Sequence, residues 1–115
     1  MSSDPTKRIK AIIKELGYPF HKFNLKDFTQ YIEWEITRAE IILMPTSLGG
    51  KDGYCIRTPA RSYIAYEPDT DSTHQLRNIL YGLGHIILQG SLIWHPPDER
   101  EIRLFVKQVI QEISA

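Results

Sequence analysis

Residues 70–90 read TDSTHQLRNILYGLGHIILQG, and this stretch decides the fold. Within it, apolar residues recur at helical spacing and form one stripe that must face a core, namely Leu76, Ile79, Leu80, Leu83, Ile86 and Ile87. Residues that favour helix N-caps are dense just before the stripe, from Pro68 to Ser72. The pattern therefore predicts a long helix that ends near Gly90.

A second stripe follows the other face of this predicted helix. Its members, spaced four, three and four residues apart, are His74, Asn78, Tyr81 and His85. Any helix with an apolar face also needs a polar one, so periodicity alone favours an ordinary surface here. Gly82 and Gly84 flank the stripe, and each glycine costs about 1 kcal/mol inside a helix. Two glycines in three residues predict that another segment, or a ligand, closely approaches the helix backbone.

The N-terminal part of the chain predicts two helices. Asp4 and Pro5 are typical of a helix start, and Gly17 is placed to end the first helix. Asn24 caps a second helix whose apolar stripe consists of Leu25, Phe28, Ile32 and Ile36. Residues 1–38 are therefore expected to form a helical lead-in.

The middle of the chain predicts a small sheet. Ala39 to Met44 is a short apolar run stopped by a proline, and the segments 54–56 and 63–66 are rich in aromatic and β-branched residues. These two segments flank a longer loop, which indicates a hairpin. We therefore expect a three-stranded, mainly antiparallel sheet, followed by the long helix and a C-terminal helix that starts near Pro96-Pro97-Asp98-Glu99. The expected fold class is α+β, with residues 1–115 in one domain whose core spans 39–115.

Composition excludes few functions. Fourteen basic residues balance fourteen acidic ones, so no overall field attracts nucleic acid or an anionic membrane. The single cysteine, Cys55, cannot form an internal disulfide and is expected to be a small buried apolar residue. The N-terminus lacks a signal-peptide core, and no apolar run approaches the roughly 20 residues that span a bilayer. A cytoplasmic protein with no direct nucleic-acid partner and no membrane partner is expected.

The segment Tyr81-Gly82-Leu83-Gly84-His85, followed by three apolar residues, resembles the H-E-L-G-H-hydrophobic motif of the ImmA/IrrE family of small zinc metallopeptidases. The resemblance extends upstream through the stretches 53–59, 63–67 and 72–75. Downstream, residues 99–106 (EREIRLFV) are similar to the family's E-x-E-A-x-x-F-A helix. Together, these stretches extend the resemblance over about residues 40–110, and the resemblance implies a small zincin-like domain.

In that family, the two histidines of the motif bind zinc, the glutamate polarises the attacking water, and an acid from the next helix completes the site. By position, the second histidine is His85 and the downstream acid is Glu101. Tyr81 replaces the first histidine, and Gly82 stands at the position of the general base. The resemblance thus implies no catalytic residue and no metal cofactor, with His85, Glu101 and Tyr81 as remnant ligand positions. Whether His95 could substitute as a ligand stays open.

Three functions follow from this degenerate motif. The first is an inactive peptidase relative that regulates or binds a protein partner, such as a helix-turn-helix repressor or a toxin–antitoxin partner of a phage or mobile element. The old substrate cleft, near His74, Asn78, Tyr81 and His85, would hold that partner. The alternatives are a zinc-dependent metallopeptidase with a rearranged metal site and a purely structural interaction domain. If the scaffold is the family's, changing Tyr81→His together with Gly82→Glu should recover zinc binding.

Overall fold

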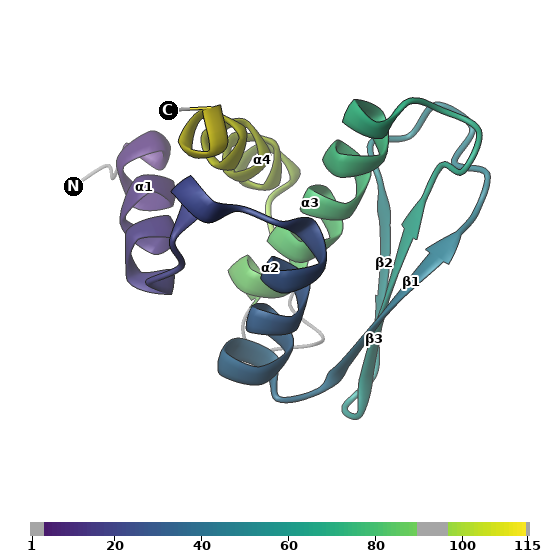
Figure 1. The fold of residues 1–115 in the computed structure, drawn as a ribbon, viewed down its shortest axis with the longest axis horizontal. Coiled ribbons are helices and arrows are strands. Elements are labelled where there is room, and N and C mark those ends of the chain that lie inside the picture. The colour runs from purple at the N-terminus through teal and green to yellow at the C-terminus, as the bar shows by residue number, and fades with distance from the viewer. Residues whose placement is uncertain (1–3, 90–96, 115) are drawn as a thin grey trace.

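The computed structural model describes residues 4–89 and 97–114 (Figure 1). Helix α1 (Pro5–Leu16), a short 3₁₀ turn η1 (Phe20–Lys22), helix α2 (Leu25–Tyr31) and a π-helical segment η2 (Ile32–Thr37) come first. Strands β1 (Glu40–Pro45), β2 (Tyr54–Arg57) and β3 (Arg61–Tyr66) follow, and then helices α3 (Ser72–Gln89) and α4 (Glu99–Ser114). The expected α+β class is confirmed.

The helix ends lie where their capping residues predict. Asp4 accepts a hydrogen bond from the Thr6 backbone N–H at 3.0 Å, and Gly17 ends α1 in the left-handed region with φ 67°. Asn24 accepts from the backbone N–H of Asp27 at 3.0 Å and so caps α2. These contacts depend only on residues close together in the chain.

The second helix does not continue as a regular α-helix. It widens into η2, and a π-helical turn holds more residues than an α-helical turn, so positions four apart no longer share a face. Ile32 is fully buried, whereas Ile36 is 40% exposed and Trp34 is 73% exposed. The expectation that Ile36 belongs to the buried stripe is therefore wrong.

The sheet is mixed rather than mainly antiparallel, which corrects the expectation from sequence. Strands β2 and β3 form the predicted antiparallel hairpin, with Ile56 opposite Tyr63. Strand β1, however, pairs in parallel with the other edge of β3, so the strand order is β1-β3-β2. The connection from β1 to β2, residues 46–53, is long enough to cross two strand spacings, about 10 Å. Strand β3, whose Ile64 and Ala65 are fully buried, occupies the position with both edges paired.

Helix α3 is the centre of the molecule. It covers one face of the sheet, and α4 packs on its other side, with α1 against α4 (Figure 1). The largest fully buried side chains come from the sheet and from all four α-helices, and they include Ile9, Phe28, Ile64, Leu80 and Phe105. Of the second stripe of α3, Asn78 and Tyr81 are buried and His85 is half-buried, so only His74 lies on the solvated face that periodicity favoured.

The glycines of α3 allow this close packing. A Cβ atom at Gly82 would lie 2.4 Å from Cγ2 of Ile64, and one at Gly84 would lie 2.7 Å from Cδ2 of Phe105. The absence of a side chain at Gly82 thus lets α3 pack closely on β3, and the absence of one at Gly84 lets α3 pack closely on α4. The expectation that another segment closely approaches the α3 backbone is confirmed on both sides.

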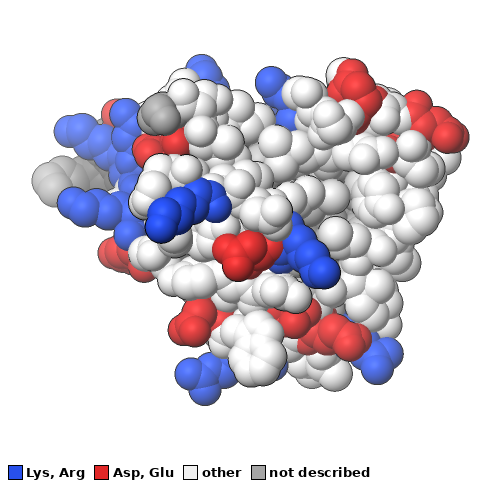
Figure 2. Space-filling model, in the orientation of Figure 1, with Lys and Arg blue, Asp and Glu red and all other residues white. Residues whose placement is uncertain are grey.

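The outer face of the sheet carries no helix among the described residues (Figure 1). Tyr54 and Ile56 of β2 are exposed on it. Uncharged side chains dominate the surface in this part of the molecule, whereas basic side chains gather over α1 (Figure 2). In the described ranges, no helix combines the length and the apolar character that crossing a membrane requires.

Candidate functional site

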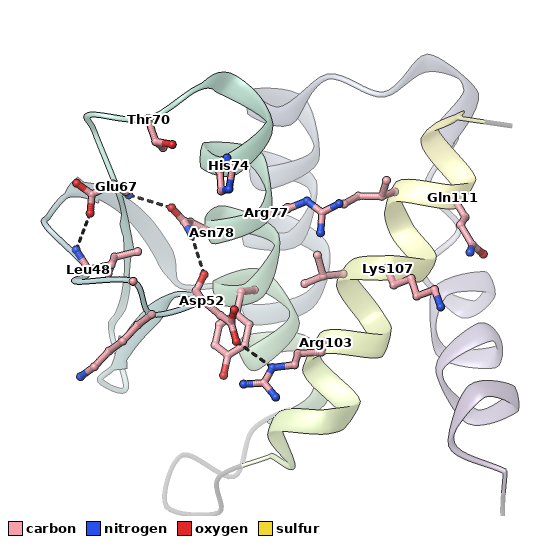
Figure 3. A pocket seen from close by; sticks show the side chains of 15 residues that line it. Leu48, Asp52, Glu67, Thr70, His74, Arg77, Asn78, Arg103, Lys107 and Gln111 are labelled. Carbon is pink, nitrogen blue, oxygen red and sulfur yellow. Dashed lines mark hydrogen bonds and ion pairs between the residues drawn. The ribbon is translucent and has the colours of Figure 1, made fainter.

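A cavity of about 840 Å³ lies between α3, α4 and the loop 46–53 (Figure 3). We call it the α3–α4 groove. The stripe of α3 that lines it consists of His74, Arg77, Asn78 and Tyr81. The facing stripe of α4 consists of Arg103, Val106, Lys107, Ile110 and Gln111. Both sets have the three- and four-residue spacing of one helix face, so two helices supply most of the groove walls.

Three of the four cleft residues expected from sequence line this groove, namely His74, Asn78 and Tyr81. His85 does not, because it lies one turn further along α3, where it is affected by the charge of Arg57 on β2. His74 is exposed at the groove mouth, where its backbone N–H donates to the carboxylate of Asp71 at 2.8 Å. The predicted stripe is therefore divided between an open groove and a partly buried position.

Asn78 holds two segments against α3. Its side-chain oxygen accepts a hydrogen bond from the Glu67 N–H at 3.0 Å, and its amide nitrogen donates to the carbonyl oxygen of Asp52 at 2.7 Å (Figure 3). The side chain of Asn78 is almost fully buried, and both bonds are partly shielded from water. Asn78 therefore shapes the groove and has little hydrogen-bonding capacity left for a ligand.

The loop 46–53 is fastened at two further points. The Glu67 carboxylate accepts from the Leu48 N–H at 2.7 Å, and Arg103 of α4 donates to the Asp52 carboxylate at 2.9 Å (Figure 3). Sequence analysis did not identify these residues, because each contact joins positions 19 or 51 residues apart. The loop is thus a positioned wall of the groove.

Tyr81 closes the inner end of the groove. Its ring packs against Gly53, where an added Cβ would lie 2.8 Å from Cδ1 of the tyrosine. Burial raises the pKa of the phenol, and the nearby charges of Glu99 and Asp52 raise it further. Tyr81 is therefore a neutral phenol at neutral pH, which is a poor metal ligand.

His85 is a partly buried histidine whose Nδ1 atom has no hydrogen-bond partner among the described residues. Burial lowers its pKa below the ordinary 6.5, and the charge of Arg57 lowers it further. Above the ordinary value, His85 is neutral in both the folded and the unfolded chain. Below it, the unfolded chain binds the proton more readily, so the free energy of unfolding falls as pH drops through the interval between the two pKa values.

The His85→Gln variant should therefore lose less stability than wild type between about pH 7 and about pH 5.5. Urea denaturation at both pH values measures this difference. The matched control is His21→Gln, because His21 is an exposed histidine on η1. A slope that is equal in His85→Gln and wild type would show that His85 does not resist protonation in the folded state.

Glu101, the expected downstream acid, does not join Tyr81 and His85. It forms an ion pair with Arg8 of α1, on the opposite side of α4 from the groove. Glu99 is the acid that approaches them, since its charge affects the pKa of both Tyr81 and His85. Residues two apart on a helix point about 200° apart, so only one of the two acids can face α3. The packing of α4 between α1 and α3 decides whether Glu99 or Glu101 faces α3. The sequence pattern does not predict this packing.

The residues around His85 do not fit a catalytic zinc site. Such a site takes three protein ligands, whereas here one imidazole and one carboxylate lie beside a neutral phenol. Within residues 4–89 and 97–114, no three His, Cys, Asp or Glu side chains gather to hold a metal ion. His95 lies outside the described residues. Moreover, a glutamate at position 82 has no space, because its Cβ would overlap Ile64.

Cys55 is not a nucleophile in this fold. Its side chain faces the core, and burial raises the pKa of the thiol to about 11. At about pH 8 only about one thiol in a thousand would be ionised, and the thiolate is the reactive form. We expect the folded protein to react with Ellman's reagent roughly a hundredfold more slowly than the urea-unfolded protein. Equal rates in the two states would show that Cys55 is accessible and ionised.

Comparisons with protein-family models, with curated proteins and with solved structures give no match for this chain.

Proposed function

We propose that this chain is a non-catalytic binding protein, built on a zincin-like scaffold related to the ImmA/IrrE peptidases, that holds a protein partner in the α3–α4 groove. The observation that carries the proposal is the arrangement of α3. At the position of the general base, Gly82 is closed against Ile64, while the preceding two turns line a groove of about 840 Å³. The helix that would carry the metal motif thus offers a surface for binding and no groups for hydrolysis.

The partner class follows from the resemblance. Members of the ImmA/IrrE family act with helix-turn-helix repressors of mobile elements or stand beside such regulators in toxin–antitoxin-like pairs. We propose a cytoplasmic helix-turn-helix repressor or antitoxin as the partner. A regulator held in the groove would be sequestered without being cut, since Gly82 supplies no carboxylate at the position of the motif's general base.

The groove favours binding over the alternative of a purely structural domain. Tyr81 and Val106 reach the groove from the edge of the core, yet the space beyond them is open and rimmed by charged residues. A rearranged metallopeptidase has little support, because the described residues around His85 supply one imidazole and the carboxylate of Glu99 but no third metal ligand. No specific contact between described residues favours either the purely structural domain or the rearranged metallopeptidase.

Affinity capture from cells of the native host tests this proposal. The full chain is immobilised as wild type, as Ile110→Arg in the groove, and as Ile36→Arg on η2, a matched change outside the groove. Wild type and Ile36→Arg should retain a protein with a helix-turn-helix domain, identified by mass spectrometry, and Ile110→Arg should not. Thermal melting checks that all three proteins are folded. Recovery of no such protein by wild type, or equal recovery by Ile110→Arg, would refute the proposal.

A further inference from the structure

The α3–α4 groove carries an excess of positive charge. Its lining includes Lys51, Arg77, Arg103 and Lys107 but only two carboxylates. Both carboxylates are engaged, because Asp52 pairs with Arg103 and Glu67 accepts from a backbone N–H. No carboxylate of the described residues lies within ion-pair distance of the other three cations. Since the whole chain has equal numbers of basic and acidic residues, this excess is a local feature of the groove.

The positive edge continues beyond the groove. Lys107 also borders a smaller neighbouring cavity of about 140 Å³, and Lys10 of α1 lies on the far side of that cavity. Further basic side chains, with acidic ones among them, gather over α1 (Figure 2). An acidic ligand would therefore be attracted to the groove from the α1 side as well.

The floor of the groove is apolar. Leu48, Tyr81 and Val106 are buried beneath it and present apolar atoms to the cavity, and Ile110 is partly exposed beside them. A nucleic acid would bring phosphates to the cations but would leave this floor uncovered. A ligand with one apolar face and carboxylates along its edges would satisfy both features.

The groove walls select a helical ligand over an extended one. Helices α3 and α4 have their backbone groups bonded internally, and in the loop wall the Asp52 carbonyl and the Leu48 N–H are bonded to side chains. An extended peptide needs a partner edge for its own backbone, whereas a helix satisfies its backbone by itself. The two helices offer side chains for recognition and almost no free backbone.

We infer that the occupant of the α3–α4 groove is an acidic amphipathic helix of the protein partner. This inference rests on the proposed function and adds the chemistry of the partner's binding segment. Apolar side chains of that helix would contact Leu48, Val106 and Ile110 on the floor. Its carboxylates would pair with Arg77 on one wall and Lys107 on the other.

Fluorescence anisotropy with the full chain tests the inference directly. The probe is a labelled amphipathic peptide of about 18 residues, five helical turns, with leucine on one face and glutamate on its flanks. A second peptide carries lysine in place of every glutamate, and a labelled DNA duplex is the third probe. The double variant Arg77→Glu with Lys107→Glu reverses the charge of two of the four groove cations. The control, Lys22→Glu with Lys26→Glu, makes the same net charge change on η1 and α2, outside the groove.

The acidic peptide should bind wild type saturably, and the groove double variant should weaken this binding by roughly tenfold or more. The control double variant should stay within about twofold of wild type, because distant exposed charges are screened. Equal weakening by both variants, or equal binding of the lysine peptide, would overturn the inference. Tighter binding of the DNA duplex than of the acidic peptide would assign the groove to nucleic acid. If self-association of the chain competes with peptide binding, the groove is assigned to a second copy. Either outcome would also overturn the acidic-helix inference.

The two experiments separate the inference from the proposed function. If the captured regulator depends on Ile110 but is not displaced by the acidic peptide, the proposed function stands and the acidic-helix inference fails. If the peptide binds but no regulator is captured, the groove chemistry is correct and the proposed partner class is wrong.

Discussion

The Gly82→Glu variant is expected to fail to fold. The Cβ of any side chain at this position would lie 2.4 Å from Cγ2 and 2.9 Å from Cγ1 of Ile64, so α3 and β3 would have to separate. Overpacking of this kind costs about 1–3 kcal/mol or more, and burial of an unpaired carboxylate adds several kcal/mol. The sum is comparable to the whole stability of a typical domain, about 5–15 kcal/mol. Circular dichroism and urea denaturation measure the loss.

Gly82→Ala tests the steric reason by itself. Alanine is about 1 kcal/mol better than glycine inside a helix, so destabilisation by alanine can only come from the contact with Ile64. Combining Gly82→Ala with Ile64→Ala should cost less than the sum of the two single changes, because the second change makes room for the first. Thr73→Glu, at an exposed position of the same helix, is the control for adding a charge. A folded and stable Gly82→Glu protein would contradict the packing of α3 on β3.

The same contact argues against the expectation from sequence that Tyr81→His with Gly82→Glu recovers zinc binding. The double change adds a glutamate where the helix has closed against the sheet, and it leaves Glu101 bound to Arg8 on the far side of α4. The packing of α3 thus leaves no room for a glutamate at position 82, and changes at positions 81 and 82 alone would not assemble a metal site.

Asn78→Ala is expected to destabilise the protein by about 1–3 kcal/mol, since it removes a buried amide and leaves a partly buried N–H and a partly buried carbonyl without their partner. The Glu67 N–H and the Asp52 carbonyl would lose their bonds of 3.0 and 2.7 Å at the same time. The loop 46–53 would then lose one of its fastenings to α3. Urea denaturation measures the stability, and hydrogen exchange of the Glu67 amide measures the local opening.

The control for this prediction is Gln75→Ala on the same helix. Gln75 also donates to a backbone carbonyl, that of Pro68 at 3.1 Å, but this bond is exposed to water. Its loss should change the stability by no more than about 0.5 kcal/mol. If Asn78→Ala is as mild as Gln75→Ala, the buried amide does not hold the groove together.

The features that sequence predicts correctly are local. The caps at Asp4, Gly17 and Asn24, the β2–β3 hairpin and the long helix each depend on residues within a few positions of one another. Periodicity also identifies the apolar stripe of α3, because any helix must bury such a stripe.

The features that sequence misses depend on long-range packing. The place of β1 at the far edge of β3 is decided by which strand is most deeply buried, and the local pattern does not carry this information. The choice between Glu99 and Glu101 depends on the rotation of α4, and the burial of Asn78 and Tyr81 depends on the loop 46–53. The site residues were found in part, because α3 supplies one wall of the groove and α4 and the loop supply the others.

We propose that α3 serves to bind a partner and not to hold a metal ion. Metal analysis of the untagged protein, purified without added metal or chelator, tests it most directly when wild type and His85→Ala are compared. We expect zinc far below one equivalent per chain in both proteins. One equivalent of zinc in wild type that is lost in His85→Ala would contradict it.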